Sequence, residues 1–408
     1  MIVVVGAGAA GFMAAIHATH GGKPVTLLER MAEGGRKILI SGGGRCNVLP
    51  SVLDVGRFVT DSSRPTMTNM LRAWPVEEQR RYFEEVLGVP LALEAATGKL
   101  FPASNRAREV RDALLFAARQ AGATIRYGAH VKEVIPTPSG WSVALADRTT
   151  LAADAVILAT GGLSVPATGS DGFGLAAARQ LGHPIHPTYP ALTPLVAEPA
   201  VHSDLAGVSL EATLRGTDNH GRSVLATGGF LFTHRGYSGP AVLDVSHLSA
   251  RSGLDGGPRA RIGVQWSRHD SEAWDRILRA QGRQSVATVV RREIPLRLAD
   301  RILAQAAIPP DQTLAQLGRE ARRVLIGLLS DYDLPWTGDE GYKKAEVTGG
   351  GVALSEVNPV TLESRRSPGL FFCGEMLDAF GPIGGYNFAW AWATGRAAGL
   401  GAGGASGR

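Results

Sequence analysis

The stretch "MIVVVGAGAAG", residues 1–11, decides the fold of the first part of this chain. The run Ile2–Val5 consists of β-branched residues, which is typical of a buried parallel strand. Gly6, Gly8 and Gly11 follow with the spacing G-x-G-x-x-G, and the overlapping run "AAGFMAAIHATH" is typical of a helix. A strand, a glycine turn and a helix in this order predict a dinucleotide-binding, Rossmann-like α/β fold.

Each position of this turn has a physical role in binding a dinucleotide. Gly6 permits the tight turn, Gly8 lets the backbone approach a pyrophosphate, and Gly11 lets the helix pack closely on the strand. Ala9 and Ala10 begin the helix, where free N–H groups and a partial positive charge favour phosphates. We therefore expect these five residues to bind a cofactor.

A second apolar run, "PVTLL", leads to Glu29, which lies 23 positions after Gly6. This is close to the spacing of about 20 residues at which dinucleotide-binding folds place an acid. Glu29 can accept hydrogen bonds from ribose hydroxyls, whereas a glycine turn without a ligand would leave it unexplained. Arg30 is also expected among the cofactor contacts; it would suit the 2′-phosphate of NADP, but the carboxylate before it would repel that phosphate.

The segment "RKILISGGGRCN", residues 36–47, favours FAD over NAD. The glycines leave the backbone beside the basic side chains unobstructed. Main-chain N–H groups can therefore approach a long cofactor that crosses the strand ends. Basic side chains here can offset the charge of a pyrophosphate or of a reduced flavin. The expected cofactor contacts in this segment are Arg36, Lys37, Ser41, Gly43, Gly44, Arg45, Cys46 and Asn47.

Two later segments support the same cofactor. The run "AVILATGG", residues 155–162, reads as a buried strand followed by a second glycine turn. The run Leu370–Cys373 reads as another strand, after which Glu375 can hold ribityl hydroxyls. "GGYN" then opens a helix through about Ala398, whose N-terminus would stabilise an anionic reduced flavin. Further cofactor contacts are expected at Val131, Thr160, Gly161, Gly374, Glu375, Gly384, Gly385, Tyr386 and Asn387.

Five motifs extend this interpretation over most of the chain: "GGGRCN", "GKLFPASNRAREV", "FTHRGYSGPAVLDVS", "AEVTGGGV" and "GEMLDAFGPIGGYN". With them the chain resembles the aminoacetone-oxidase and bile-acid-reductase-like family of NAD(P)/FAD-dependent flavoproteins. The resemblance implies bound FAD and a discontinuous FAD domain that is interrupted by inserted domains. Phe388 departs from the glutamine that more usually follows "GGYN" in that family.

A chain of 408 residues is expected to form two or three domains. We predict a discontinuous Rossmann-like FAD-binding domain from residues 1–188 and 345–408. Strand-like runs separated by turn residues predict a β-barrel or sandwich over 189–268, and helical spacing predicts a helical domain over 269–344. The insert has no second G-x-G-x-x-G, so NAD(P)H is expected only as a transient reductant. The glycine-rich end from residue 399 is expected to be disordered.

Composition narrows the class of protein. Two cysteines cannot form a disulfide framework, which fits a reducing cytoplasm. No apolar run reaches about 18 residues, so we expect no membrane span. The first apolar run has no basic leader, which favours a strand over a signal peptide. The net charge of +5 comes from basic residues interleaved with acidic ones, so nucleic-acid binding is not favoured. The expected partner is a small-molecule substrate, and the sequence predicts no particular oligomeric state.

Proton transfer is needed if hydride transfer at flavin N5 makes or breaks a C–N, C–O or C=C bond. His234 in "FTHRGYSGP" ends a predicted strand before a glycine turn, and it can donate or accept a proton. Tyr237, close to it, can donate one. The alternative is that His234 only packs against or caps the turn between two strands.

Three interpretations remain open for Cys46: thiol redox chemistry favoured by the adjacent Arg45, contact with the flavin, or inert packing. His183 and His186 have the spacing H-x-x-H, but Pro184 interrupts any helix that would aim both at one ion. No metal site is therefore expected.

The sequence thus predicts an FAD-dependent oxidoreductase that transfers a hydride between flavin N5 and a small amine, alcohol or enone-like substrate. The alternatives are an FAD-bearing RNA-binding or RNA-modifying protein, or a non-catalytic flavin redox sensor.

Overall fold

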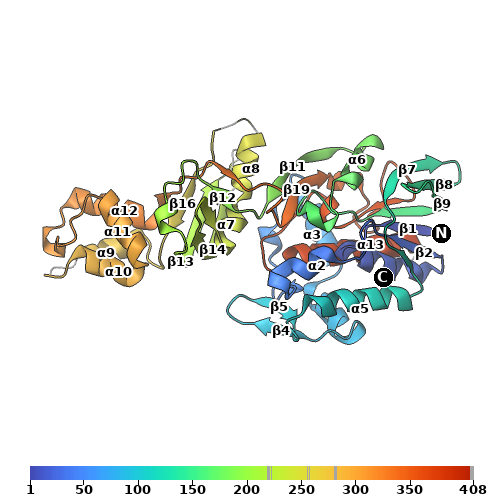
Figure 1. Cartoon of the computed structure of the whole chain (residues 1–408), viewed down its shortest axis with the longest axis horizontal. Helices are drawn as coiled ribbons and strands as arrows, with labels where there is room; N and C mark the ends of the chain where they lie inside the picture. The colour runs from blue at the N-terminus through green and yellow to red at the C-terminus, as the bar shows by residue number, and fades with distance from the viewer. Residues whose placement is uncertain (218–220, 222, 255, 257, 280–282, 405–408) are drawn as a thin grey trace. The chain divides into compact units, whose positions relative to one another are not determined.

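The computed structural model describes residues 1–217, 221, 223–254, 256, 258–279 and 283–404 (Figure 1). The chain divides into two compact units. The first unit contains residues 1–189 and 346–408, and the second contains residues 190–345. The second unit is therefore an insertion in the sequence of the first.

A five-stranded parallel sheet in the order β20-β10-β1-β2-β6 forms the centre of the first unit. Its strands are β1 (Ile2–Val5), β2 (Val25–Leu28), β6 (Thr124–Arg126), β10 (Ala155–Leu158) and β20 (Leu370–Phe372). Every residue of β1, β10 and β20 is buried, because both faces of the sheet are covered. Val156 of β10 pairs with Leu370 of β20, so the C-terminal segment completes the sheet that the N-terminus begins.

Helices and smaller sheets surround this centre. The helices are α1 (Ala9–Ala18), α2 (Arg36–Ile40), α3 (Arg64–Arg72), α4 (Val76–Arg81), α5 (Ala107–Gln120), α6 (Phe173–Gln180) and α13 (Tyr386–Gly403). One antiparallel sheet, β3-β5-β4, contains β3 (Leu49–Pro50), β4 (Leu91–Glu94) and β5 (Lys99–Pro102). Another, β7-β8-β9, contains β7 (Val131–Thr137), β8 (Gly140–Leu145) and β9 (Thr150–Ala153). The strands that lead into and out of the insertion, β11 (Ile185–Ala191) and β19 (Val347–Val352), pair with each other.

Helices α1 and α13 pack against each other through small residues spaced four apart. A Cβ on Gly395 would lie 2.4 Å from the carbonyl oxygen of Ala10. A Cβ on Gly399 would lie 2.4 Å from the carbonyl oxygen of Ala14. Glycine at these positions lets the two backbones approach more closely than any side chain would permit.

The C-terminal helix extends further than the sequence predicts. It continues past Ala398 to Gly403, through glycines that are unfavourable in an isolated helix. Gly399 packs against α1, and a Cβ on Gly401 would lie 2.6 Å from the carbonyl oxygen of Thr361. Close packing thus orders the first part of the predicted disordered tail, whereas residues 405–408 lie outside the described residues.

The second unit combines a sheet with helices. Its strands, in the order β17-β16-β13-β14-β15-β12-β18, are β12 (Leu195–Val196), β13 (Ser209–Thr217), β14 (Ser223–Phe232), β15 (Gly236–Ser238), β16 (Ile262–Gln265), β17 (Tyr332–Asp333) and β18 (Gly338–Asp339). Its helices are α7 (Pro240–Val245), α8 (His247–Leu254), α9 (Ser271–Leu278), α10 (Val286–Glu293), α11 (Leu296–Gln305) and α12 (Arg319–Ser330).

This sheet differs in form from the predicted barrel or sandwich. Its order ends in the edge strands β17 and β18, and among the described residues no hydrogen-bonded pair closes it into a ring. Helix α7 packs on β14, where a Cβ on Gly229 would lie 3.4 Å from Pro240. A helix therefore covers strand surface that a second sheet would cover in a sandwich.

One hydrophobic core joins the strands and helices of the second unit. It includes Leu214 and Val264 of the sheet together with Trp274 and Leu298 of the helices. The predicted boundary at residue 268 falls between β16 and α9 and stays a prediction, because the two parts share this core. Among the described helices, none has the length and hydropathy needed to cross a membrane.

The packing of α13 on α1 predicts opposite effects for two glycine-to-alanine substitutions. Gly399→Ala should lower the free energy of unfolding by about 1–3 kcal/mol, because its methyl group would press on the Ala14 backbone. Gly327→Ala in α12 is the matched control, since its Cβ would meet no atom within 4 Å. It should raise that free energy by about 0.5–1 kcal/mol through helix propensity. Denaturant unfolding followed by circular dichroism measures both, and equal effects would contradict the close approach of α1 and α13.

Candidate functional site

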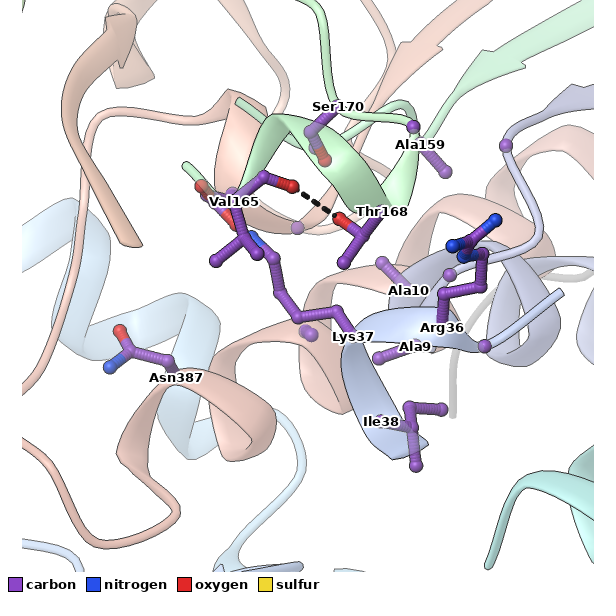
Figure 2. Close-up of a pocket in the computed structure, with 18 of the residues that line it drawn as sticks. Ala9, Ala10, Arg36, Lys37, Ile38, Ala159, Val165, Thr168, Ser170 and Asn387 are labelled. Atoms are coloured by element: carbon purple, nitrogen blue, oxygen red, sulfur yellow. Dashed lines mark hydrogen bonds and ion pairs between the residues drawn. The ribbon is translucent and has the colours of Figure 1, made fainter. Parts of the chain in front are cut away.

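A cavity of about 430 Å³ lies at the carboxyl edge of the parallel sheet in the first unit (Figure 2). Glu29, Gly6, Ala159 and Cys373, which directly follow β2, β1, β10 and β20, all line it. These strands are consecutive neighbours in the sheet, so the cavity crosses four strand ends in turn. Its volume lies in the range of about 300–1,000 Å³ that is usual for ligand sites. Open α/β sheets bind ligands at this edge.

Glu29 marks the β2 end of the cavity. Its carboxylate accepts hydrogen bonds from the backbone N–H of Ala7 at 2.9 Å and of Met31 at 2.8 Å. Burial raises the pKa of Glu29, while these backbone hydrogen bonds act in the opposite direction. The adjacent Arg30, also a predicted cofactor contact, lines the cavity and forms an ion pair with Asp171. The acid predicted to bind a ribose is therefore held firmly beside the first glycine turn.

The first glycine turn leaves open space where the sequence predicts a phosphate. A Cβ on Gly8 would meet no atom within 4 Å, and the N–H groups of Ala9 and Ala10 begin helix α1 there. Figure 2 shows Ala9 and Ala10 beside Arg36 of α2, and all three line the cavity. Gly11 does not line it, because a Cβ there would lie 1.8 Å from the Gly6 carbonyl oxygen, behind the turn.

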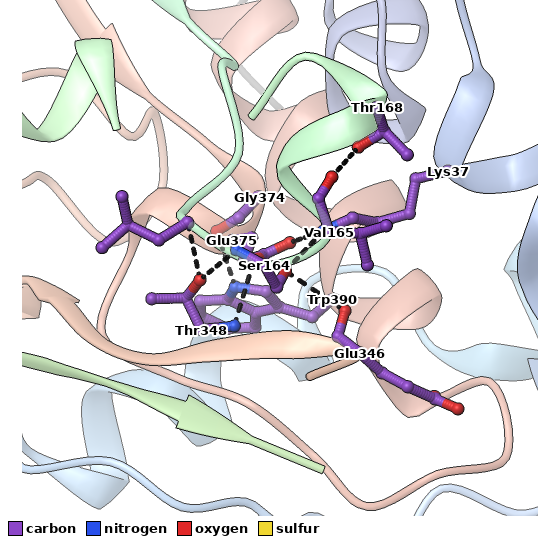
Figure 3. Close-up of polar contacts among 10 residues, drawn as sticks. Lys37, Ser164, Val165, Thr168, Glu346, Thr348, Gly374, Glu375 and Trp390 are labelled. Carbon is purple, nitrogen blue, oxygen red and sulfur yellow. Dashed lines mark hydrogen bonds and ion pairs between the residues drawn. The ribbon is translucent and has the colours of Figure 1, made fainter. Parts of the chain in front are cut away.

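The β20 end of the cavity carries a polar cluster (Figure 3). Lys37 Nζ lies 2.6 Å from Glu375 Oε2 and 2.7 Å from Ser164 Oγ. Ser164 donates to Glu375 Oε1 at 2.5 Å, and the backbone N–H of Thr348 donates to the same oxygen at 3.0 Å. Ser164 Oγ also lies 3.3 Å from the Glu346 carbonyl oxygen. Both oxygens of Glu375 therefore have partners, and these partners come from α2, β19 and the loop after β10.

The triple glycine after α2 adopts a left-handed backbone, with φ of 56° at Gly42, 67° at Gly43 and 86° at Gly44. Only residues that tolerate this conformation fit such a turn. Among the contacts predicted for this segment, the cavity is lined by Arg36, Lys37, Ser41, Gly43 and Asn47. Gly42, which belongs to the predicted triple-glycine turn but was not among the predicted contacts, lines it as well, and Gly44 does not.

Arg45 and Cys46 do not line the cavity, contrary to the prediction. The Arg45 guanidinium pairs with Glu94 at 3.0 Å and lies over the Phe101 ring, 4.0 Å from its centroid. The Cys46 side chain is fully buried, and burial raises its pKa to about 12. Since the thiolate is the reactive form, packing is the role that fits Cys46.

The remaining predicted cofactor contacts that line the cavity are Val131, Thr160, Gly161, Gly374, Glu375, Gly384, Gly385 and Asn387. Tyr386 does not, because its ring packs on Phe58 with centroids 5.7 Å apart. Phe388 lines the cavity and stacks on Trp392. The sequence did not single out Lys99, Glu346, Phe173 or Ile383, which also line it. Lys99 lies in the motif "GKLFPASN" and Glu346 lies in "AEVTGGGV", but neither motif indicated a role for these residues.

The two predicted catalytic residues belong to the second unit. His234 is exposed in the turn between β14 and β15. Tyr237 is fully buried, and its hydroxyl lies 2.8 Å from Nδ1 of His202, whose Nε2 lies 3.0 Å from the Tyr332 hydroxyl. Burial raises the pKa of Tyr237. The structure thus gives Tyr237 partners inside a core, and both catalytic roles stay predictions.

The two histidines of the H-x-x-H pattern belong to different networks. His183 lies 3.3 Å from a Glu356 oxygen and 3.2 Å from Ser364 Oγ. His186 lies 3.7 Å from an Asp378 oxygen. In the part of the chain that the structure describes, no three His, Cys, Asp or Glu residues form a group that could hold a metal ion.

The family model of the HI0933-like protein Rossmann domain matches residues 1–401. A ribosomal RNA dihydrouridine synthase of Escherichia coli (strain K12) is 33% identical over 396 residues, covering 96% of this chain and 95% of that protein. A 3-dehydro-bile acid delta(4,6)-reductase of Clostridium scindens is 33% identical over 407 residues, covering 98% of both. The solved 3-ketosteroid delta1-dehydrogenase of Sterolibacterium denitrificans shares the fold, with a TM-score of 0.53, 12% identity and 99% of both chains covered.

The buried thiols predict a simple chemical result. Neither cysteine should react with DTNB at a mildly alkaline pH in the folded protein, because both are fully buried and burial raises both pKa values, that of Cys46 to about 12. Unfolding in guanidinium chloride should release both thiols and provides the control. Rapid labelling of one thiol in the native protein would show that Cys46 or Cys373 is accessible.

Proposed function

The chain belongs to the HI0933-like family, and we propose that it is an FAD-dependent reductase of carbon–carbon double bonds conjugated to a carbonyl group. The main observation in support of bound FAD is the cavity, which crosses four strand ends from Glu29 to Glu375. Helix α1 begins at one part of this cavity and helix α13 at another. Such a cavity suits an extended anionic cofactor with a charged group near each helix N-terminus.

Different residues of the cavity would contact different parts of FAD. Glu29 would hold the adenosine ribose, and the open space before Gly8 would receive the pyrophosphate against the N-terminus of α1. Glu375, oriented by Lys37, would hold the ribityl hydroxyls. The N-terminus of α13, with Asn387, would face the flavin ring. When bound, FAD supplies the group that accepts and donates hydride.

The names of two relatives support the proposed bond type. A dihydrouridine synthase saturates the C5=C6 bond of uracil, which is conjugated to a carbonyl group. A 3-dehydro-bile acid delta(4,6)-reductase acts on double bonds conjugated to the 3-oxo group. In the proposed reaction a hydride would join the carbon β to the carbonyl group and a proton would join the α carbon. NADH or NADPH is proposed as the source of the electrons. This bond type corresponds to the enone-like substrate among those predicted from the sequence.

An RNA uridine is the second candidate substrate, favoured by the relative from Escherichia coli and by the net charge of +5. Many basic side chains of the second unit, however, are committed to carboxylates of the same unit. Arg301 pairs with Asp204 at 3.2 Å, and Arg261 pairs with Asp331 at 2.9 Å. Such pairs offer less positive charge to a phosphate backbone. We therefore place a small conjugated carbonyl compound first.

The proposal predicts two half-reactions that can be measured separately. The purified protein should carry FAD, and anaerobic NADH or NADPH should remove its visible absorbance. Either 4-androstene-3,17-dione or an unmodified ribosomal RNA transcript should then restore it, and the more effective acceptor identifies the substrate class. A reduced flavin that only oxygen reoxidises would overturn the reductase proposal, and protein that takes up no FAD would overturn the cofactor.

Glu29→Ala tests the cofactor assignment alone. Loss of hydrogen bonds from ribose hydroxyls to a carboxylate should weaken FAD binding by about 10- to 100-fold. Titration of the FAD-free protein, followed by quenching of flavin fluorescence, measures the affinity. Glu77→Ala, on the exposed face of α4, is the matched control and should bind FAD like the wild type. Equal affinity in the two variants would contradict the role of Glu29.

A further inference from the structure

A carboxylate that the sequence did not single out faces the cavity at its β20 end. Glu346 lines the cavity, and its side chain is accessible to solvent although the surrounding protein partly desolvates its carboxylate. Its backbone is fixed: its carbonyl oxygen lies 3.3 Å from Ser164 Oγ, and strand β19 begins at the next residue. Figure 3 shows its carboxylate extending away from the contacts between Ser164 and Glu375. Within the described residues, no hydrogen bond or ion pair engages that carboxylate.

Two lysines line the same cavity and act electrostatically on Glu346. Lys37, from α2, already pairs with Glu375 at 2.6 Å. Lys99, from β5, passes close to the turn before α13, where a Cβ on Gly384 would lie 3.6 Å from its Cε. Burial raises the pKa of Glu346, whereas the charges of Lys99 and Lys37 act to lower it. Glu346 and Lys99 thus remain as an acid and a cation that are not committed to Glu375.

Three other side chains, Glu375, Cys46 and Tyr237, are less suited than Glu346 to donate a proton. Both oxygens of Glu375 accept hydrogen bonds from neighbours. The Cys46 thiol is buried and does not line the cavity, and the Tyr237 hydroxyl is held by His202 in the core of the second unit.

We propose that Glu346 delivers the proton to the α carbon of the substrate and that Lys99 binds its carbonyl oxygen. This inference rests on the proposed reductase function and assigns two catalytic residues to it. A carbonyl oxygen held by an ammonium group is polarised, which stabilises the negative charge that develops there when a hydride joins the β carbon.

These two roles account for the bonds, electrons and protons of the proposed reduction. The hydride forms a C–H bond at the β carbon, and the π electrons of the double bond move toward the carbonyl oxygen beside Lys99. The α carbon then takes the proton of the Glu346 carboxyl group, and the C=O bond is restored. The Glu346 carboxylate regains a proton from water that reaches its exposed side chain. The two electrons of the hydride would come from NADH or NADPH.

Anaerobic half-reactions of the FAD-loaded protein test these roles. Glu346→Gln keeps the shape of the side chain but has no acidic proton. It should slow reoxidation by 4-androstene-3,17-dione or the RNA transcript about 100-fold or more, while reduction by NAD(P)H keeps the wild-type rate. Lys99→Met should slow reoxidation as well, and Glu77→Gln is the matched control. Unchanged reoxidation in Glu346→Gln, or slowing confined to His234→Ala, would overturn the assignment to Glu346.

A spectroscopic titration gives a readout that does not depend on turnover. Ionisation of Glu346 near the flavin should shift the visible flavin absorbance as the pH rises, and Glu346→Gln should lack that transition. Its midpoint should move to higher pH in Lys99→Met, because loss of a nearby cation disfavours the carboxylate. A transition that Glu346→Gln retains would contradict the placement beside the flavin. Wild-type protein that reduces no conjugated carbonyl compound would instead overturn the reductase proposal itself, whatever the titration shows.

Discussion

The close packing of α1 against α13 is the constraint on which the candidate site depends. Alanines of α1 meet glycines of α13 backbone to backbone, as the approach of Gly395 to Ala10 shows. This contact joins the two ends of the chain and lets β20 extend the sheet that β1 begins. Both helices start at the cavity, so the same packing brings two helix N-termini to one binding space. A larger side chain at Gly395 would therefore disturb the fold and the site together.

The charges of the cavity are distributed between its ends. Glu29 closes the β2 end, where backbone N–H groups satisfy its carboxylate. At the β20 end Lys37 and Glu375 neutralise each other and fix several loops. Paired groups of this kind cost less to bury than isolated charges. What remains beside them is an acid, Glu346, and a cation, Lys99, both facing the cavity.

Two relatives with the same identity of 33% carry names that differ in substrate but share a type of bond. The second unit has its own sheet, helices and hydrophobic core. Proteins that share a fold can differ in function, because function depends on the residues at particular sites. The fold shared with a ketosteroid dehydrogenase therefore does not indicate the substrate of this chain.

The sequence by itself determined the βαβ start, the acid at Glu29 and the later strand with Glu375, because each is a local pattern of strand, glycine turn and acid. It also indicated an insertion. Tertiary structure alone decided that Arg45 turns to Glu94 and away from the cavity, since a side chain's direction depends on partners distant in the chain. It also brought Lys99 and Glu346 to one cavity, although neither lies in a local pattern that signals a site. The local backbone conformation depends mainly on residues that are neighbours in the sequence, whereas contacts between side chains that are distant in the sequence depend on how the chain packs.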